Sequence, residues 1–184
     1  MLSVSGRTLS GFWILCLTAF LFSMKASAAT YVVAKQNCSD TAAGTAAQPW
    51  CTIGHAAAKM VPGDTVTIGP GSYNESVSPK SGTAVAFITY QGQPGAVLNG
   101  TGLNAQAFNI DNVAYLNISG FEVTQYLQPR PAGNSVDIYG TSHDIHFSKM
   151  LVHDNWNGII MSDSANNIYI SSSTVYNSRY GVGF

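Results

Sequence analysis

Apolar and polar residues alternate in short segments along the second half of the chain, and these segments recur at a fixed spacing. Residues 144–148 (DIHFS) and 167–171 (NIYIS) lie 23 residues apart and carry apolar side chains at the same alternate positions. The same offset relates Val152 to Val175. Alternation with a period of two predicts strands, and self-similarity at a period of this length predicts a solenoid.

An earlier copy of the repeat, residues 115–119 (YLNIS), precedes residues 144–148 by 29 residues. The six extra residues fall in 125–134 (QYLQPRPAGN), a segment that contains proline and glycine. Insertions at one corner of a coil are typical of stacked repeats and often carry function. We therefore expect a loop at this corner, next to the following coil.

Each coil contains three short strands, which in the last coil lie near residues 168–170, 173–175 and 182–184. Strands this short cannot bury their apolar side alone, but stacking them about 4.8 Å apart pairs their backbones and builds a continuous interior. We predict an all-β fold, a single-stranded right-handed parallel β-helix with three short strands per coil.

This stacking predicts columns of equivalent side chains. The first inward column contains Val66, Ile88, Leu116, Ile145 and Ile168. The second contains Phe108, Val136, Ile159 and Val182, and the third Ile110, Ile138, Met161 and Phe184. An outward column contains Thr67, Thr89, Asn117, His146 and Tyr169.

The N-terminus differs in character from the repeat. Residues 12–22 (FWILCLTAFLF) form an apolar run, and Ala26-Ser27-Ala28 provides a cleavage motif of small residues. This pattern predicts a secretory signal peptide over residues 1–28. A membrane anchor is the alternative, but the run is short for about 30 Å of hydrocarbon. We expect a secreted or periplasmic protein without membrane contact after cleavage.

Residues 29–63 are predicted to cap the solenoid. Residues 52–61 (TIGHAAAKMV) favour a short helix with Thr52 as its N-cap, ended by Pro62 and Gly63. Cys38 and Cys51 are the cysteines left after cleavage. Export favours a disulfide between them, with two free thiols as the alternative.

Residues 64–184 then form the coils. The sequence stops partway into a predicted strand of the third column, so we expect these coils to be the first part of a longer β-helix, truncated at the C-terminus.

Charged residues make up only 9% of the chain, so the outer faces of the strands must be polar mainly through Gly, Ser, Thr and Asn. Removing Arg7 and Lys25 with the signal peptide leaves six basic against nine acidic residues. No basic run is present, which argues against nucleic acid as a partner. We expect a monomer.

Several short motifs follow one another in a familiar order: residues 49–53 (PWCTI), 62–66 (PGDTV), 69–75 (GPGSYNE) and 152–155 (VHDN). This order resembles the N-terminal region of secreted bacterial right-handed β-helix proteins, including polysaccharide lyases of the pectate-lyase-9 kind and related β-helix repeat proteins. The resemblance covers residues 30–184 and implies the fold and an acidic polysaccharide as partner. These are capping and coil motifs, and they contain no catalytic signature of that family.

The repeat places several chemically capable side chains at one corner. Aromatic rings stack on sugars, and arginine pairs with uronate carboxylates. Cleavage of a uronate by β-elimination needs a group that neutralises the carboxylate, a base and an acid. The residues whose types fit these catalytic roles are His153, Asp154, Arg130 and Arg179, with Lys149 as an alternative base. The predicted substrate-binding residues are Trp156, Tyr126, Tyr176, His146 and Tyr169.

Other interpretations stay open. The same residues also suit a solvated polar face without any ligand. No cofactor is evident, although Ca²⁺ would fit the family, and Asp154 with Asn155 offers only part of a site. His143 and His146 point to opposite faces of a strand, which disfavours a metal pair. The leading hypothesis is a protein that binds acidic polysaccharide, and whether it also cleaves uronates as a polysaccharide lyase is left open. The rival is a non-catalytic structural or adhesive cell-surface β-helix.

Overall fold

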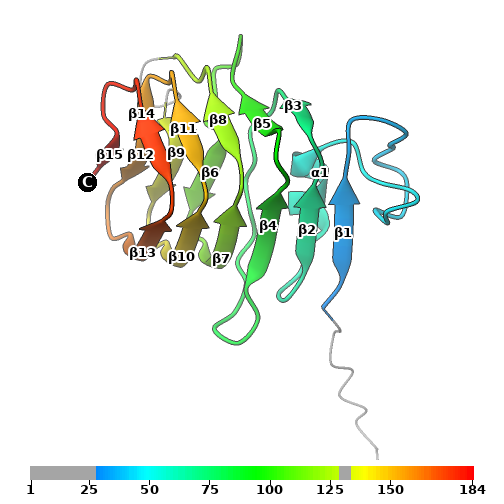
Figure 1. Ribbon diagram of the computed structural model, residues 1–184. Coiled ribbons are helices and arrows are strands. Elements are labelled where there is room, and N and C mark those ends of the chain that lie inside the picture. Colours follow the sequence, from blue (N-terminus) through cyan, green and yellow to red (C-terminus); the bar gives the residue numbers. More distant parts are fainter. Residues whose placement is uncertain (1–27, 129–133) are drawn as a thin grey trace, which may run out of the picture.

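The computed structural model describes residues 28–128 and 134–184, and they form a stack of coils with three strands per full coil (Figure 1). The predicted signal peptide lies almost wholly outside the described residues, and so does Arg130. All strand pairs between coils are parallel. The predicted all-β parallel β-helix is therefore confirmed.

Three sheets run along the stack. The six-stranded sheet has the order β1 (Thr30–Val33), β2 (Thr65–Ile68), β4 (Ile88–Gly92), β7 (Ala114–Ser119), β10 (His143–Ser148) and β13 (Asn166–Ser171). The five-stranded sheet has β3 (Gly71–Tyr73), β5 (Ala96–Asn99), β8 (Glu122–Thr124), β11 (Leu151–His153) and β14 (Thr174–Tyr176). The four-stranded sheet has β6 (Phe108–Asp111), β9 (Asn134–Tyr139), β12 (Asn157–Met161) and β15 (Val182–Gly183).

The register confirms the repeat in the later coils. Ile145 pairs with Ile168 on one side and with Leu116 on the other, and Ile159 pairs with Val182. Ile145 and Leu116 are fully buried. Each such side chain stabilises the fold by about 1.5–3 kcal/mol before the entropy cost is counted. The residues predicted to lie above one another therefore do so.

The predicted columns are wrong at the two ends of the stack. Val66 pairs with Tyr90 rather than aligning with Ile88, and Thr65 rather than Thr67 pairs with Thr89. A shift of two residues keeps every side chain on its own face, so alternation alone does not detect it. At the other end, Phe184 is fully exposed instead of completing the third inward column.

The first rung is β1, which the sequence assigned only to the cap. β1 pairs with β2 in parallel, and Val33 bridges to Trp50. The one helix among the described residues, α1 (Ile53–Lys59), buries Ile53 and Ala56 in the core. In Figure 1, α1 lies at the β1–β3 end of the stack. The predicted helix and its N-cap Thr52, whose side chain accepts a bond from His55 N, are confirmed.

Two carboxylates fix the start of α1. Asp40 accepts hydrogen bonds from Cys51 N at 2.8 Å and from the Thr52 hydroxyl at 2.8 Å. Glu75 accepts from the first backbone N–H groups of the helix, that of Ile53 among them, which have no partner within a helix. The predicted disulfide between Cys38 and Cys51 is present in the same segment.

The Asp40 contacts predict how the cap responds to acid. Burial opposes ionisation of the Asp40 carboxyl, but the bonds from Cys51 and Thr52 outweigh it and lower its pKa. The stabilisation is therefore present above about pH 3.9, the unfolded pKa of an aspartate, and is lost as pH falls through the lower folded value.

We expect Asp40→Ala to lower the free energy of unfolding by about 1 kcal/mol at pH 6, a modest value because the carboxylate is partly exposed. Below about pH 3 the difference from the wild type should shrink as the carboxylate is protonated. Urea denaturation at the two pH values measures this. Asp111→Ala, which removes an exposed carboxylate elsewhere, is the control. A difference that does not depend on pH would contradict the assignment.

Candidate functional site

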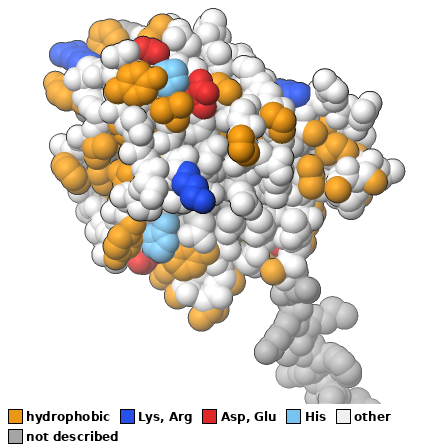
Figure 2. Space-filling view, in the orientation of Figure 1, with side chains coloured by type: hydrophobic (Ala, Val, Ile, Leu, Met, Phe, Trp, Pro, Cys, Tyr) orange, Lys and Arg blue, Asp and Glu red, His pale blue; other side chains and the backbone are white. Residues whose placement is uncertain are grey.

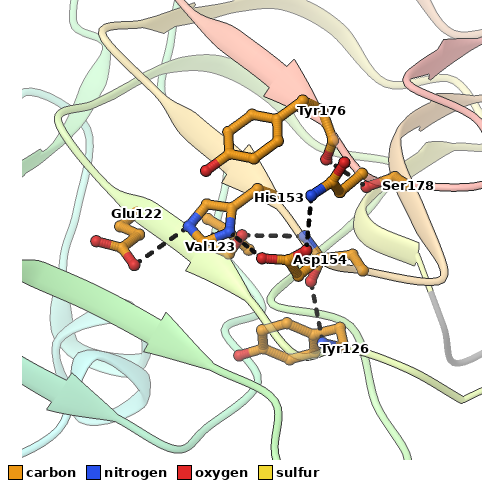
Figure 3. Close-up of polar contacts among 9 residues, drawn as sticks. Glu122, Val123, Tyr126, His153, Asp154, Tyr176 and Ser178 are labelled. Atoms are coloured by element: carbon orange, nitrogen blue, oxygen red, sulfur yellow. Dashed lines mark hydrogen bonds and ion pairs between the residues drawn. The ribbon is translucent and has the colours of Figure 1, made fainter.

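Two clusters of polar and aromatic side chains each include residues that follow β11 in the sequence. The His153 patch comprises Glu122, His153, Asp154, Tyr176 and Asn177, and it lies on the outer face and edge of the five-stranded sheet (Figure 3). His153 pairs with Tyr176 in the β11–β14 register. Their rings stack with centroids 5.0 Å apart and planes 6° apart.

Both ring nitrogens of His153 contact carboxylates. Nδ1 lies 2.7 Å from Asp154 Oδ2, and Nε2 lies 3.2 Å from Glu122 Oε1, so the ring sits between the two acids (Figure 3). The His153 side chain is only 14% exposed. A general base needs a nitrogen within reach of the substrate proton. In this arrangement His153 reaches such a proton only after Glu122 moves away.

Asp154 has a left-handed backbone conformation, which the sequence pattern did not predict. Its φ is +51°, and the equivalent residues one coil before and after, Gln125 and Asn177, have φ of +64° and +48°. Aspartate and asparagine adopt this left-handed conformation more readily than most residues. Asn177 also donates a hydrogen bond to Asp154 Oδ1 at 3.1 Å. The bond from His153, followed by that from Asn177, lowers the pKa of Asp154.

The second cluster forms the Arg179 groove, a depression of about 630 Å³. It is lined by Trp156, Asn157, Ile160, Arg179, Tyr180, Gly183 and Phe184. The Arg179 guanidinium lies 5.5 Å from the ring centroids of both Trp156 and Tyr180. In the described part of the chain, no salt bridge includes Arg179. The groove therefore combines two aromatic rings with a cation whose charge is not neutralised.

Asn157 adds a polar group at the floor of the Arg179 groove. Its side-chain amide donates to Asn134 Oδ1 at 2.8 Å, and both residues are buried. Its own Oδ1 has no hydrogen-bond partner among the described residues. A buried oxygen without a partner costs free energy, which a donor from water or from a ligand would recover.

The structure separates the predicted site residues. His153, Asp154 and Tyr176 form one patch, and Trp156 and Arg179 form the neighbouring groove. His146 and Tyr169 lie instead on the six-stranded sheet, where they pair between β10 and β13.

The prediction that Tyr126 contacts substrate is wrong. Its side chain is fully buried, and its hydroxyl donates to Glu75 O at 2.6 Å. Burial, with a smaller contribution from the Glu75 charge, raises the pKa of this phenol. Tyr126 lies in the segment 125–134 that carries the inserted residues, but it packs into the interior and so belongs to the core. Arg130, in the same insertion, falls outside the described residues.

Two residues of the site were missed from the sequence. Glu122 pairs with Leu151, and Tyr180 lies one 23-residue period after Asn157. The repeat offsets alone identify both positions, but neither residue lies in a recognisable catalytic motif.

Across residues 28–128 and 134–184, no group of three or more His, Cys, Asp or Glu side chains is arranged to hold a metal ion. The helix found in the same ranges is too short to cross a membrane.

The left-handed backbone at Asp154 yields a test of its role. We expect the melting temperature to fall most for Asp154→Ala, less for Asp154→Gly and least for Asp154→Asn. Alanine loses the side-chain bonds and also strains the backbone, glycine avoids the strain, and asparagine keeps the corner conformation. Circular dichroism melts measure the order. Equal losses for alanine and glycine would mean that the side-chain bonds, rather than the backbone, dominate.

The site and fold can be set beside known proteins. The model of a family described as "Pel9A-like, right handed beta helix region" matches residues 30–180. No curated protein matches the chain. Two crystal structures of the GH136 lacto-N-biosidase from Eubacterium ramulus share the fold. The selenomethionine derivative has a TM-score of 0.62 and 19% identity, over 78% of this chain and 33% of that one. The native protein has a TM-score of 0.58 and 18% identity, over 79% and 30%.

This chain thus spans about a third of the length of those two structures, and at this identity the likeness concerns the fold alone. The family match covers most of the sequence, includes every strand described above except β15 and gives the β-helix its right-handed sense. The chain belongs to the Pel9A-like right-handed β-helix family.

Proposed function

We propose that this protein is a secreted, carbohydrate-active β-helix that binds acidic polysaccharide in the Arg179 groove. The observation that carries the proposal is the pair of rings flanking Arg179, a cation without a salt-bridge partner in the described chain. Family membership supports a carbohydrate ligand. The disulfide between Cys38 and Cys51 supports an oxidising compartment outside the cytoplasm.

The chemistry of the groove favours an anionic sugar. The faces of Trp156 and Tyr180 suit the apolar face of a sugar ring, and the guanidinium of Arg179 suits a carboxylate through two parallel hydrogen bonds. Its lining contains no aspartate or glutamate to repel such a ligand.

The His153 patch does not attract an anionic ligand, but it affects where such a ligand can lie. Glu122 and Asp154 hold the His153 ring and place two carboxylates on this corner. These two carboxylates repel a polyanion, so binding of an acidic polysaccharide across the five-stranded sheet would be unfavourable. The Arg179 groove is then the favourable path.

Cleavage by β-elimination would require a base in addition to Arg179. Arg179 would neutralise the uronate carboxylate, but His153 has a carboxylate at each ring nitrogen and so has no free nitrogen to accept the proton. Binding without cleavage is therefore the form that the geometry supports best. A structural or adhesive role, in which the protein functions through its elongated shape alone, predicts neither binding nor cleavage of polyuronates.

Affinity gel electrophoresis with polygalacturonate in the gel tests the binding proposal. We expect Arg179→Ala to weaken binding about 10-fold, because a hydrogen-bonded charge pair is lost. Arg179→Lys should give an intermediate loss, since lysine keeps the charge but not the fork. Lys59→Ala, which removes one positive charge from α1 near the other end of the stack, is the matched control (Figure 1). Equal retardation of all variants, or none in the wild type, would refute the proposal.

Incubation with polygalacturonate or alginate separates binding from cleavage. We expect no release of unsaturated sugar ends, measured by their ultraviolet absorbance. Release by the wild type that Arg179→Ala or His153→Ala abolishes would show that the protein is a lyase. In that case Glu122→Gln should raise the rate, because it weakens the contact that occupies His153 Nε2.

A further inference from the structure

A second surface lies on the outer face of the six-stranded sheet, apart from the Arg179 groove. Its rings form the aromatic strip, which comprises Phe87, Tyr115, His143, His146 and Tyr169. Figure 2 shows hydrophobic and histidine side chains gathered over the lower part of this face, where β10 and β13 run in Figure 1. The strip continues from the segment before β4 through β7 and β10 to β13.

The rings hold one another in place. The His146 ring lies between Phe87, at a centroid distance of 5.3 Å, and Tyr169, at 4.9 Å. The planes of His146 and Tyr169 are 87° apart, an edge-to-face contact. Tyr115 makes similar contacts with Phe87 at 5.5 Å and with His143 at 5.1 Å. These contacts give the strip a fixed shape before any ligand arrives.

The register keeps these side chains outside. Asn117, His146 and Tyr169 are direct partners across β7, β10 and β13, and they alternate with buried partners such as Ile145 and Leu116. Tyr169 is 57% exposed. Packing of the core therefore does not explain why aromatic residues occupy this outward column.

A shallow groove of about 730 Å³ accompanies the strip. It is lined by Phe87, Asn117, Asp144, His146, Phe147, Ser148, Tyr169 and Ser171. This lining contains no lysine or arginine, and its one carboxylate, Asp144, contacts His143 Nδ1 at 2.7 Å. Its other polar groups are the imidazole of His146, the amide of Asn117 and hydroxyls. The charge of the groove thus disfavours an anionic chain, whereas the Arg179 groove favours one.

We propose that the aromatic strip is a second glycan-binding surface, selective for uncharged sugar rings of a polysaccharide that runs along the stack. The exposed face of Tyr169 stacks on a ring, and the neighbouring hydroxyl and amide groups bond its hydroxyls. Equivalent side chains recur about every 4.8 Å along the sheet. The surface therefore suits an extended chain rather than a single small sugar. One protein then contacts charged and uncharged glycan at separate places.

Affinity gel electrophoresis with neutral galactomannan or mixed-linkage β-glucan in the gel tests this proposal. Tyr169→Ala and His146→Ala should each weaken binding by about 2- to 10-fold, the loss expected for one stacking ring. Tyr169→Phe should keep most of the binding, because it preserves the ring. The matched control is Tyr180→Ala, which removes a tyrosine of 55% exposure from the Arg179 groove and should leave neutral-glycan binding unchanged.

The outcomes separate this proposal from that for the Arg179 groove. The aromatic strip is supported if Tyr169→Ala loses binding to neutral glycan while Tyr180→Ala and Arg179→Ala keep it. This conclusion does not depend on how the variants bind polygalacturonate. No binding of neutral glycan by the wild type overturns it, and so does a loss caused only by Tyr180→Ala. Self-association of the wild type that Tyr169→Ala abolishes, measured by sedimentation velocity without glycan, would also overturn it and make the strip an interface between copies.

Discussion

Parallel stacking of coils in register is the constraint on which the rest of the structure depends. A strand of two to six residues has too few contacts to stand alone, and here each strand obtains its backbone partners from the coils next to it. Because the register partners repeat from coil to coil, an apolar inward residue lies next to apolar residues in the neighbouring coils. Leu116, Ile145 and Ile168 are such partners. The outward residues are placed by the same register, so surface chemistry is organised in columns that run along the stack.

This constraint explains what the sequence could and could not predict. Where two copies of the repeat are recognisable, as in β10 and β13, the fixed offset placed the residues correctly on both faces. In the early coils no copy fixes the offset, and Val66 was placed two residues out of register. The strand β1 was missed because Thr30–Val33 has no repeat partner in the sequence, although its pairing with β2 is regular.

The candidate sites were predicted less well than the fold, for a physical reason. Outward position is readable from alternation, but contact between side chains depends on rotamers and on neighbours from other coils. The pairs His153–Tyr176 and Trp156–Arg179 follow directly from the repeat, and the structure brings both together. Tyr126 follows strand β8 where the period is interrupted, and alternation gave no sign that its ring turns inward to reach Glu75. The engagement of both His153 nitrogens likewise depends on side-chain geometry.

The left-handed corner shared by Gln125, Asp154 and Asn177 bears on how such proteins change length during evolution. A corner made by one residue with a permissive backbone leaves the strands before and after it in the same relation in every coil. Duplication or deletion of one whole repeat unit therefore preserves the geometry of its neighbours, whereas a gain of one residue inside a strand moves the following side chains to the opposite face. Gene segments that encode complete coils are accordingly the units in which a family of this kind can lengthen or shorten its outer surfaces.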